Sequence, residues 1–115
     1  MIHRGEIYYA QLEDGVGSEQ DGLRPVLVVQ NETGNLRSRT IIVIPITSAV
    51  KNTLATHVEL GRNYGLFLES TALAEQIFTL DRWRFGDYIG TVDDMKMLEV
   101  DQALRVSLAL DYDNE

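Results

Sequence analysis

Residues 24–47 read RPVLVVQNETGNLRSRTIIVIPIT, and two apolar runs within this stretch decide the fold. A half-exposed strand alternates between apolar and polar residues, whereas a strand without alternation is buried on both faces. Neither run alternates, and each is bounded by polar or turn-forming residues. We therefore predict two buried β-strands, 25–30 and 40–47, joined by a connecting turn at residues 31–39.

Shorter segments on both sides predict the remaining β-structure. EIYYAQL at residues 6–12 is rich in β-favouring side chains, and the glycine-bearing, acidic stretch 13–23 predicts a loop after it. The later elements are all short: a strand at 56–60 after a polar loop, one or two strands within 66–76, a single helical turn at 81–85 and a last strand at 87–92.

The period of the pattern changes after residue 92, where four apolar side chains recur at helical spacing: Met97, Val100, Leu104 and Leu108. This spacing predicts an amphipathic helix over residues 93–110. Asp93 suits the N-cap position, and Val92 can pack against Met97 as a hydrophobic staple. The tail 111–115 is too polar to pack against a core.

Length and composition describe one domain. The chain has 115 residues, of which 44% are hydrophobic, enough for one compact core. We expect that domain to span residues 1–110. Five to seven short strands and one terminal helix predict a mainly β protein, a small, strongly curved barrel with a C-terminal α-helix packed on it. Side chains fill a barrel of this size, so a site must lie on its rim or at an interface.

Several classes of site are disfavoured by composition. The chain has no cysteine, so disulfides and thiolate metal sites are excluded. Its two histidines, His3 and His57, do not have the spacing of a metal-binding pair, and no carboxylate cluster suggests a metal site. The longest apolar run, 41–46, is too short to span a membrane, and the N-terminus does not resemble a signal peptide. We expect a cytoplasmic protein.

Charge is distributed unevenly along the chain. The formal net charge of −8 divides into −1 for residues 1–62 (six basic, seven acidic) and −7 for residues 63–115 (four basic, eleven acidic). Phosphate binding normally needs a basic surface, so the balance disfavours nonspecific binding to duplex nucleic acid. The nearly neutral first half, with its arginines, still allows a short single strand to bind.

Arg24 lies where the predicted loop 13–23 meets the first buried strand. The residue before a proline is restricted to extended geometry, and Pro25 is tolerated at the start of a strand. The side chain of Arg24 is therefore held at a defined place, as a functional cation would be. An ion pair with Glu19 or Asp21 at the rim is the structural alternative.

Six motifs follow one another along the chain: RGEIYYAQL at 4–12, GSEQDGLRPVLVVQN at 17–31, PITS at 45–48, THVEL at 56–60, AEQIFTLD at 74–81 and a helix that begins with DD and ends in SLAL at 93–110. In this order they resemble the MazF/PemK family of bacterial toxins over essentially the whole chain. The motif GSEQ-x-G-x-RPVLV is the most specific of them.

This resemblance implies a fold related to SH3 barrels and a homodimer. It also implies a sequence-specific endoribonuclease that cleaves single-stranded RNA without metal or cofactor. The partner would be a MazE/PemI-like antitoxin, whose flexible C-terminal segment lies across the RNA groove of the dimer and holds the toxin inactive.

The resemblance also assigns roles to residues. Arg24 and Thr47 match positions that the family uses for catalysis. Further residues match positions near the RNA: Ser18, Glu19, Gln20, Pro25, Ser48, His57, Glu75 and Gln76. Phe78 departs from the family, because similar sequences often carry a basic residue there; Arg82 and Arg84 can restore positive charge nearby.

The implied reaction uses the 2′-OH of the substrate as nucleophile and leaves a 2′,3′-cyclic phosphate and a 5′-OH. It requires proton transfer and stabilisation of charge on the phosphorane oxygens. The guanidinium fork of Arg24 suits the second task, although a guanidinium does not readily give up a proton at neutral pH. Thr47 can orient the 2′-OH, bond a nonbridging oxygen or relay a proton. His57 has a side chain suited to proton transfer, although a place beside the groove favours RNA contact.

Each of these residues has a structural alternative. Thr47 is a β-favouring residue at a strand end, and His57 suits a surface position on an edge strand. Gln20 and Gln76 can simply bond backbone groups. Three aromatic side chains can form core or dimer interface, with stacking on RNA as the other reading for the tryptophan: Phe78, Trp83 and Phe85.

Two other functions fit the same fold. One is a toxin that inhibits DNA gyrase by binding, without catalysis, since one scaffold can carry unrelated functions. The other is an inactive paralogue that sequesters the antitoxin. A binding protein would not need the pair Arg24 and Thr47, which favours the ribonuclease.

Overall fold

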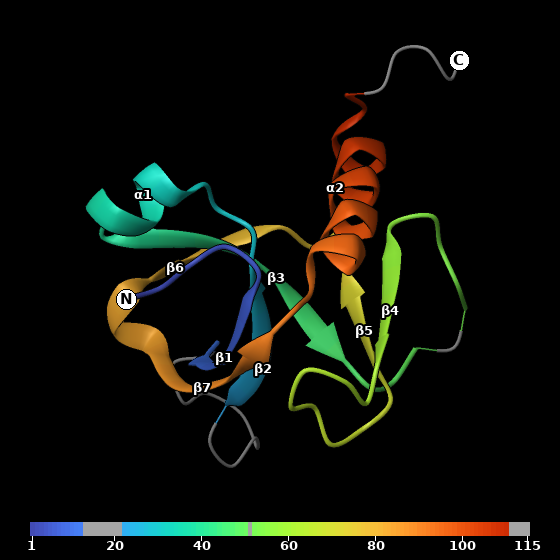
Figure 1. The fold of residues 1–115 in the computed structure, drawn as a ribbon, viewed down its shortest axis with the longest axis horizontal. Helices are drawn as coiled ribbons and strands as arrows, with labels where there is room; N and C mark the ends of the chain where they lie inside the picture. The colour runs from blue at the N-terminus through green and yellow to red at the C-terminus, as the bar shows by residue number, and fades with distance from the viewer. Residues whose placement is uncertain (13–21, 51, 111–115) are drawn as a thin grey trace.

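The computed structural model describes residues 1–12, 22–50 and 52–110 of the chain. Seven strands, two α-helices and a 3-10 turn follow one another in the described residues (Figure 1). In chain order they are β1 (Glu6–Gln11), β2 (Leu23–Val28), α1 (Glu32–Arg37), β3 (Thr40–Thr47), β4 (His57–Gly61), β5 (Ser70–Leu73), β6 (Phe78–Asp81), the 3-10 helix η1 (Arg82–Arg84), β7 (Phe85–Thr91) and α2 (Asp94–Leu108). The prediction of a mainly β fold with a C-terminal helix is confirmed.

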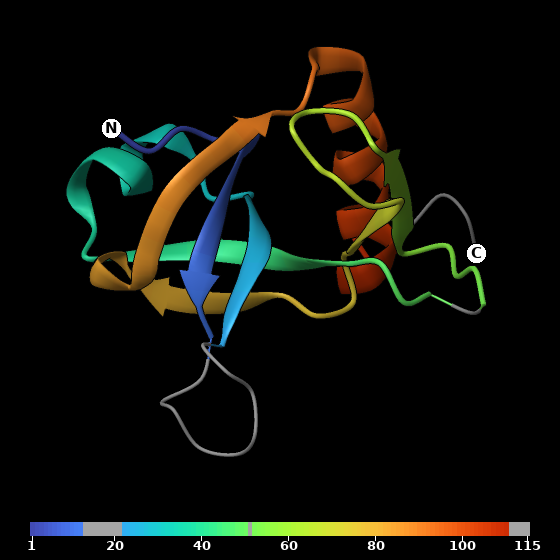
Figure 2. The same ribbon diagram turned by 90° about the horizontal axis from the view of Figure 1, so that it is seen from below.

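The long strand β3 joins the two parts of the sheet. The strand order is β4-β5-β3-β2-β1-β7, all neighbours are antiparallel, and β6 also pairs with β3. The first half of β3 pairs with β6, and its last two residues pair with β5. Strands β7, β1, β2, β3 and β6 therefore curl into a barrel, and the end of β3 extends into a wing formed by β5 and β4 (Figure 2).

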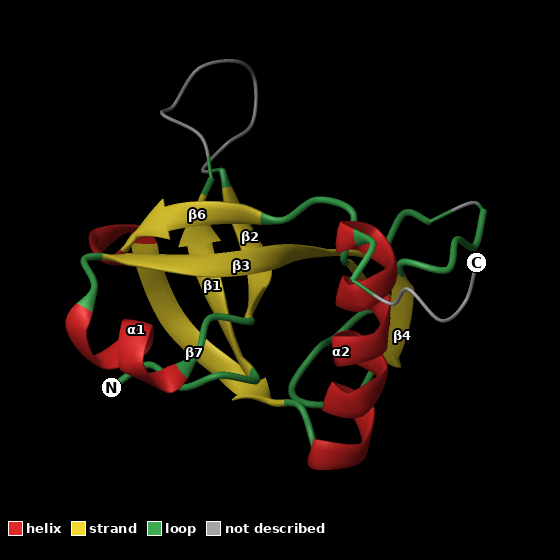
Figure 3. Ribbon diagram, turned by 90° about the horizontal axis from the view of Figure 1, so that it is seen from above, coloured by secondary structure: helices red, strands yellow, loops and turns green. Residues whose placement is uncertain are grey.

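Strands β2 and β3 are buried on both faces over part of their length, whereas Ile42 of β3 is 37% exposed. On β2, Val26 and Val28 belong to the cluster inside the barrel, whereas Leu27 belongs to a second cluster between the sheet and α2. On β3, Val43 faces the barrel cluster and Ile44 the second cluster, so these two strands separate two cores. Figure 3 shows α2 beside the barrel, against the β4 side. This arrangement explains why the two runs do not alternate, as predicted.

Helix α2 begins and packs as predicted. The Asp93 side chain accepts a hydrogen bond from the backbone N–H of Lys96 at 2.8 Å, which caps the N-terminus. Val92, Met97 and Val100 are buried in the second cluster. The placement of Leu108 on the packed face is wrong, because its side chain is 54% exposed. The last turns of α2 extend beyond β4 and β5, so no sheet lies under them (Figure 1).

The prediction of a simple turn at residues 31–39 is also wrong, because α1 lies there. Six residues are too few to show a helical period, and Gly34 lowers the helix propensity further. The helix is held at both ends instead. The Asn31 side chain accepts from the N–H of Gly34 at 2.8 Å, and the distant Arg82 donates to the carbonyl oxygens of Asn35 and Ser38.

Residues 13–21, most of the predicted loop, and the predicted tail 111–115 lie outside the described residues. Among the helices that the structure describes, none is long and apolar enough to cross a membrane. The helical turn predicted at residues 81–85 is confirmed as η1, and the predicted strands at 56–60 and 87–92 are confirmed as β4 and β7 with small shifts at their ends.

Candidate functional site

A groove of about 340 Å³ lies where the barrel meets the wing. Strand β2 contributes Arg24 and Pro25, and the end of β3 contributes Thr47 and Ser48. Four of the predicted site residues, distant in sequence, therefore line one groove. The remaining lining residues are Tyr9, Leu23, Ile46, Leu66, Phe67, Leu68 and Ser70.

Sheet register brings Arg24 and Thr47 together. Val26 pairs with Pro45 in the β2–β3 ladder. Two residues further along each antiparallel strand, side chains return to the same face, so Arg24 lies opposite Thr47. Both residues lie on the strand faces that carry the barrel cluster, beyond the last apolar residue of that cluster on each strand. The groove thus lies at the open end of the barrel, where the sequence led us to expect a site.

Arg24 is exposed, and its Nη1 donates a hydrogen bond to the carbonyl oxygen of Leu23 at 2.9 Å. It makes no ion pair with any residue that the structure describes. Glu19 and Asp21, the partners in the structural alternative, lie outside the described residues. The remaining guanidinium N–H groups of Arg24 can therefore meet an anion in the groove.

Thr47 presents a hydroxyl group at the other wall of the groove. Its Oγ1 accepts a hydrogen bond from the backbone N–H of Ala49 at 3.2 Å, which fixes the side chain at the strand end. The hydroxyl proton remains available to donate, since a threonine hydroxyl is both donor and acceptor. On its outer side, Thr47 pairs with Thr71 of β5, so the strand end is itself supported by the wing.

His57 and Glu75 form a separate cluster that does not line the groove. The Nδ1 atom of His57 accepts from the N–H of Leu54 at 3.2 Å, which leaves the proton on Nε2 for the oxygen of Glu75, 3.1 Å away. Glu75 also accepts from the hydroxyl of Thr56 at 2.8 Å. The side chain of His57 is only 8% exposed, so the expectation of a surface histidine is wrong: this edge strand is covered there by the β5–β6 turn.

Burial raises the pKa of Glu75, but the hydrogen bonds from Thr56 and His57 outweigh it and hold the pKa below its ordinary value. Gln76 follows on the exposed side of the same turn, with its backbone N–H bonded to the carbonyl oxygen of Leu73 at 3.1 Å. Ser18, Glu19 and Gln20 lie outside the described residues. In the described part of the chain, no group of three histidine, aspartate or glutamate side chains is placed to hold a metal ion.

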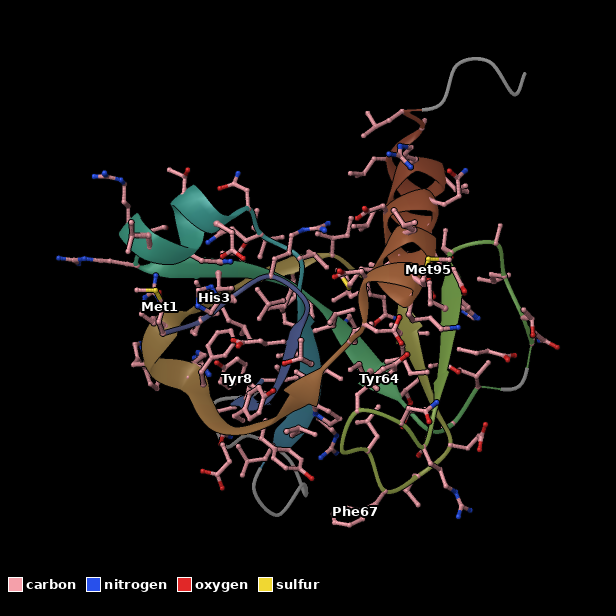
Figure 4. The ribbon with its side chains drawn as sticks, in the orientation of Figure 1. Met1, His3, Tyr8, Tyr64, Phe67 and Met95 are labelled. Atoms are coloured by element: carbon pink, nitrogen blue, oxygen red, sulfur yellow. The ribbon has the colours of Figure 1, made fainter. Side chains whose placement is uncertain are left out.

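The β4–β5 loop supplies groove residues that the sequence did not indicate. The prediction of one or two strands within residues 66–76 is confirmed by β5, which begins at Ser70, whereas the apolar residues 66–68 form a loop. Phe67 is 84% exposed and projects outward from the loop (Figure 4). A short apolar run fits either a strand or a loop that packs against other elements. Only the structure therefore shows that Phe67 and Arg24 line the same groove.

The sequence and the fold correspond to a known family. The model of the PemK-like, MazF-like toxins of type II toxin–antitoxin systems matches residues 3–108. The chain belongs to this family. The predicted membership is thereby confirmed for nearly the whole length of the chain.

Relatives of this toxin include two endoribonucleases. The chain is 49% identical over 112 residues to endoribonuclease EndoA of Bacillus subtilis, covering 96% of this chain and 97% of that protein. It is 46% identical over 112 residues to endoribonuclease MazF of Staphylococcus epidermidis, covering 96% and 93%. Among solved structures, a mycobacterial endoribonuclease in complex with its cognate antitoxin matches with a TM-score of 0.81 at 27% identity, covering 96% of this chain and 98% of that one.

Proposed function

We propose that this toxin is an endoribonuclease that cleaves single-stranded RNA in the groove between Arg24 and Thr47. The observation that carries the proposal is the groove itself, which brings a cation without an ion-pair partner among the described residues within reach of a fixed hydroxyl. Both close relatives are named endoribonucleases, which supports cleavage over a purely binding role such as gyrase inhibition.

In the proposed reaction, the 2′-OH of the RNA attacks the adjacent phosphorus. The bond to the 5′ oxygen of the next nucleotide breaks, leaving a 2′,3′-cyclic phosphate and a 5′-OH. Arg24 donates two parallel N–H groups to the phosphorane oxygens, which carry the developing negative charge. The Thr47 hydroxyl donates a hydrogen bond to a nonbridging oxygen or orients the 2′-OH. The proton that the 2′-OH loses passes to solvent water, and the departing 5′ oxygen takes one up from water to become the 5′-OH. No metal ion or cofactor is needed for these steps.

Recognition of the RNA sequence is assigned to residues around this pair. Pro25 and Ser48 line the groove, and we propose that they contact the RNA beside the scissile phosphate. We propose that Ser18, Glu19, Gln20 and Gln76 contact bases, and that His57 and Glu75 support the edge of the wing near the RNA through their mutual hydrogen bond. His57 is a positioning residue in this scheme, since both of its ring nitrogens are already bonded.

We further propose a homodimer and a MazE/PemI-like antitoxin that binds across its groove. A matching mycobacterial endoribonuclease was solved with its cognate antitoxin, which supports such a partner. Exposed apolar side chains on and after α2 support self-association: Met95, Leu98, Val106, Leu108 and Leu110. We place the toxin in the cytoplasm, where its proposed substrate, mRNA, is translated.

Cleavage of one long RNA in EDTA tests the proposal. We expect cuts at specific sites, fragments with 2′,3′-cyclic phosphate ends, and an intact all-DNA control. A substrate with deoxyribose only at the cleavage site should resist cutting at that bond, because the nucleophile is missing. Cleavage of this substrate at the same bond, or inactivity of the protein on RNA, would contradict the proposed reaction.

A further inference from the structure

A second hollow, of about 770 Å³, lies at the other end of β3. It shares no residue with the groove of Arg24 and Thr47. The end of α1, the residues just before β3, and the end of β6 with the turn η1 line it. Figure 2 shows these elements together at the end of β3 that lies away from β5. The lining residues are Leu36, Arg37, Ser38, Arg39, Asp81, Arg82 and Trp83.

Arg82 builds this hollow. Its Nη2 donates to the carbonyl oxygens of Asn35 and Ser38, and its Nε donates to Ser38 at 3.2 Å. Its backbone N–H also bonds the carbonyl oxygen of Arg39 at 2.8 Å. These bonds tie η1 to the end of α1, so the next residue, Trp83, is held at a fixed place beside the helix.

The groups that face solvent here have few partners within the protein. Trp83 is 72% exposed, and the Cζ atom of Arg84 lies 4.7 Å from the centre of its ring. Arg37 and Arg39 are exposed and form no ion pair with residues in the described ranges. Three arginines and one aspartate line the hollow, so it is cationic on a chain of formal net charge −8.

We propose that this hollow binds a nucleotide of single-stranded RNA. A base stacks on the face of Trp83 that Arg84 does not cover, and the adjacent phosphates bind Arg37 and Arg39. An exposed indole beside exposed guanidinium groups is typical of sites that bind single-stranded nucleic acid. Any base can stack on the indole, and each phosphate carries a negative charge that an arginine can neutralise. An acidic peptide would satisfy the arginines but would leave the indole without a planar partner.

The inference rests on the proposed function only in naming RNA as the ligand. Strand β3 separates the two sites: its eight residues are joined by seven steps of about 3.3 Å, so its ends lie roughly 23 Å apart. The hollow would then bind RNA upstream or downstream of the cleaved bond and raise the affinity for long substrates over short ones.

Trp83 is the sole tryptophan of the chain, so its fluorescence reports on this hollow alone. We would titrate the full-length protein with a short 2′-O-methyl oligoribonucleotide of mixed sequence, which binds but has no free 2′-OH. We expect saturable quenching. By anisotropy of the labelled oligonucleotide, Trp83→Ala should weaken binding roughly tenfold or more, and Trp83→Phe should retain most of it.

The arginines are tested by the salt dependence of the same binding. Each phosphate contact on a single strand adds about 0.7 to the slope of log affinity against log salt, so Arg37→Gln and Arg39→Gln should each reduce the slope by about 0.7. Arg62→Gln is the matched control, because Arg62 is equally exposed and lines neither site. It should leave the slope unchanged.

Cleavage and fluorescence separate this inference from the proposed function. If the protein cuts RNA but Trp83 does not respond to the oligonucleotide, the hollow is not an RNA site. Quenching with a catalytically silent protein would overturn the proposed function and support the hollow. Trp83 fluorescence that responds to an Asp/Glu-rich peptide but not to RNA would also overturn the inference. So would Trp83 emission that shifts with protein concentration alone. Either result would show that the indole contacts protein and not RNA.

Discussion

Gly90 of β7 lies directly against the backbone of Tyr64 in the β4–β5 loop. A Cβ atom at Gly90 would be 1.9 Å from the carbonyl oxygen of Tyr64, and one at Gly65 would be 2.3 Å from the carbonyl oxygen of Ile89. Tyr64 itself has a φ of 60°, a left-handed conformation. Loop and strand therefore meet backbone to backbone, and this contact fixes the loop that carries Phe67 to the groove.

Substitution of Gly90 tests that contact. Gly90→Ala should lower the free energy of unfolding by about 1–3 kcal/mol, because backbone atoms must move to admit the methyl group. Gly86→Ala in the same strand is the matched control, since its nearest neighbour would be the Tyr9 carbonyl oxygen at an ordinary 3.5 Å. Urea unfolding of both variants gives the comparison. Equal stability of the two would show that the loop does not depend on this contact.

Arg24→Lys separates geometry from charge in the groove. Lysine keeps the charge but loses the planar fork, so cleavage should fall about 10²–10³-fold, nearly as far as with Arg24→Ala. RNA binding should weaken much less, because the base contacts remain. The melting temperature should change little, since the side chain is exposed. Near-normal single-turnover cleavage by the lysine variant would show that cleavage does not need the guanidinium fork, and Arg24 would then have only a structural role.

Thr47 should tolerate serine but not valine. Serine keeps a hydroxyl that accepts from Ala49 and can donate to the RNA, whereas valine keeps only the β-branched shape. We expect Thr47→Ser to retain most of the activity and Thr47→Val to lose about a hundredfold in single-turnover rate. The melting temperatures of the two variants control for disruption of the strand end. A fully active Thr47→Val would exclude the hydroxyl from the reaction.

The cluster around Glu75 should make stability depend on acid. Its hydrogen bonds lower the pKa of Glu75 in the folded state below the ordinary 4.5, so the unfolded chain takes up the proton first. The resulting stabilisation is complete above pH 4.5 and is lost as the pH falls through the folded-state pKa. The difference in unfolding free energy between the natural chain and Glu75→Gln should therefore shrink below pH 4.5. A difference that stays constant down to pH 3 would contradict this account.

The proposed dimer is tested at α2. Leu98 is 61% exposed on the helix, and Leu98→Glu would place a charge within an apolar surface. We expect the natural chain to scatter light as a dimer at micromolar concentration and the variant to be largely monomeric. At high protein concentration, the melting temperature of the variant should be lower than that of the natural chain, because a monomer lacks the concentration-dependent stability of a dimer. A monomeric natural chain with full ribonuclease activity would refute the dimer.

Much of the fold could be predicted because its signals are local. The non-alternating runs of β2 and β3 indicated burial on both faces, and Asp93 with the spacing of Met97 and Val100 indicated α2. Helix α1 could not be predicted in this way. Its end depends on Arg82, a residue 47 positions after Asn35, and no local pattern contains that bond.

By itself the sequence indicated most of the strands, the C-terminal helix, the family and the pair Arg24 and Thr47 as candidates, but not strand β6. Only the tertiary structure decided which candidates share a site. Register across β2 and β3 places Arg24 opposite Thr47, whereas His57 and Glu75 form a hydrogen bond with each other outside the groove. Phe67 and Trp83 are exposed, and each lies near a contact between distant segments: Gly90 against the backbone of Tyr64, and the Arg82 side chain to the carbonyl oxygen of Asn35. Burial and pairing depend on the whole sheet, because side chains distant in sequence compete for the same neighbours.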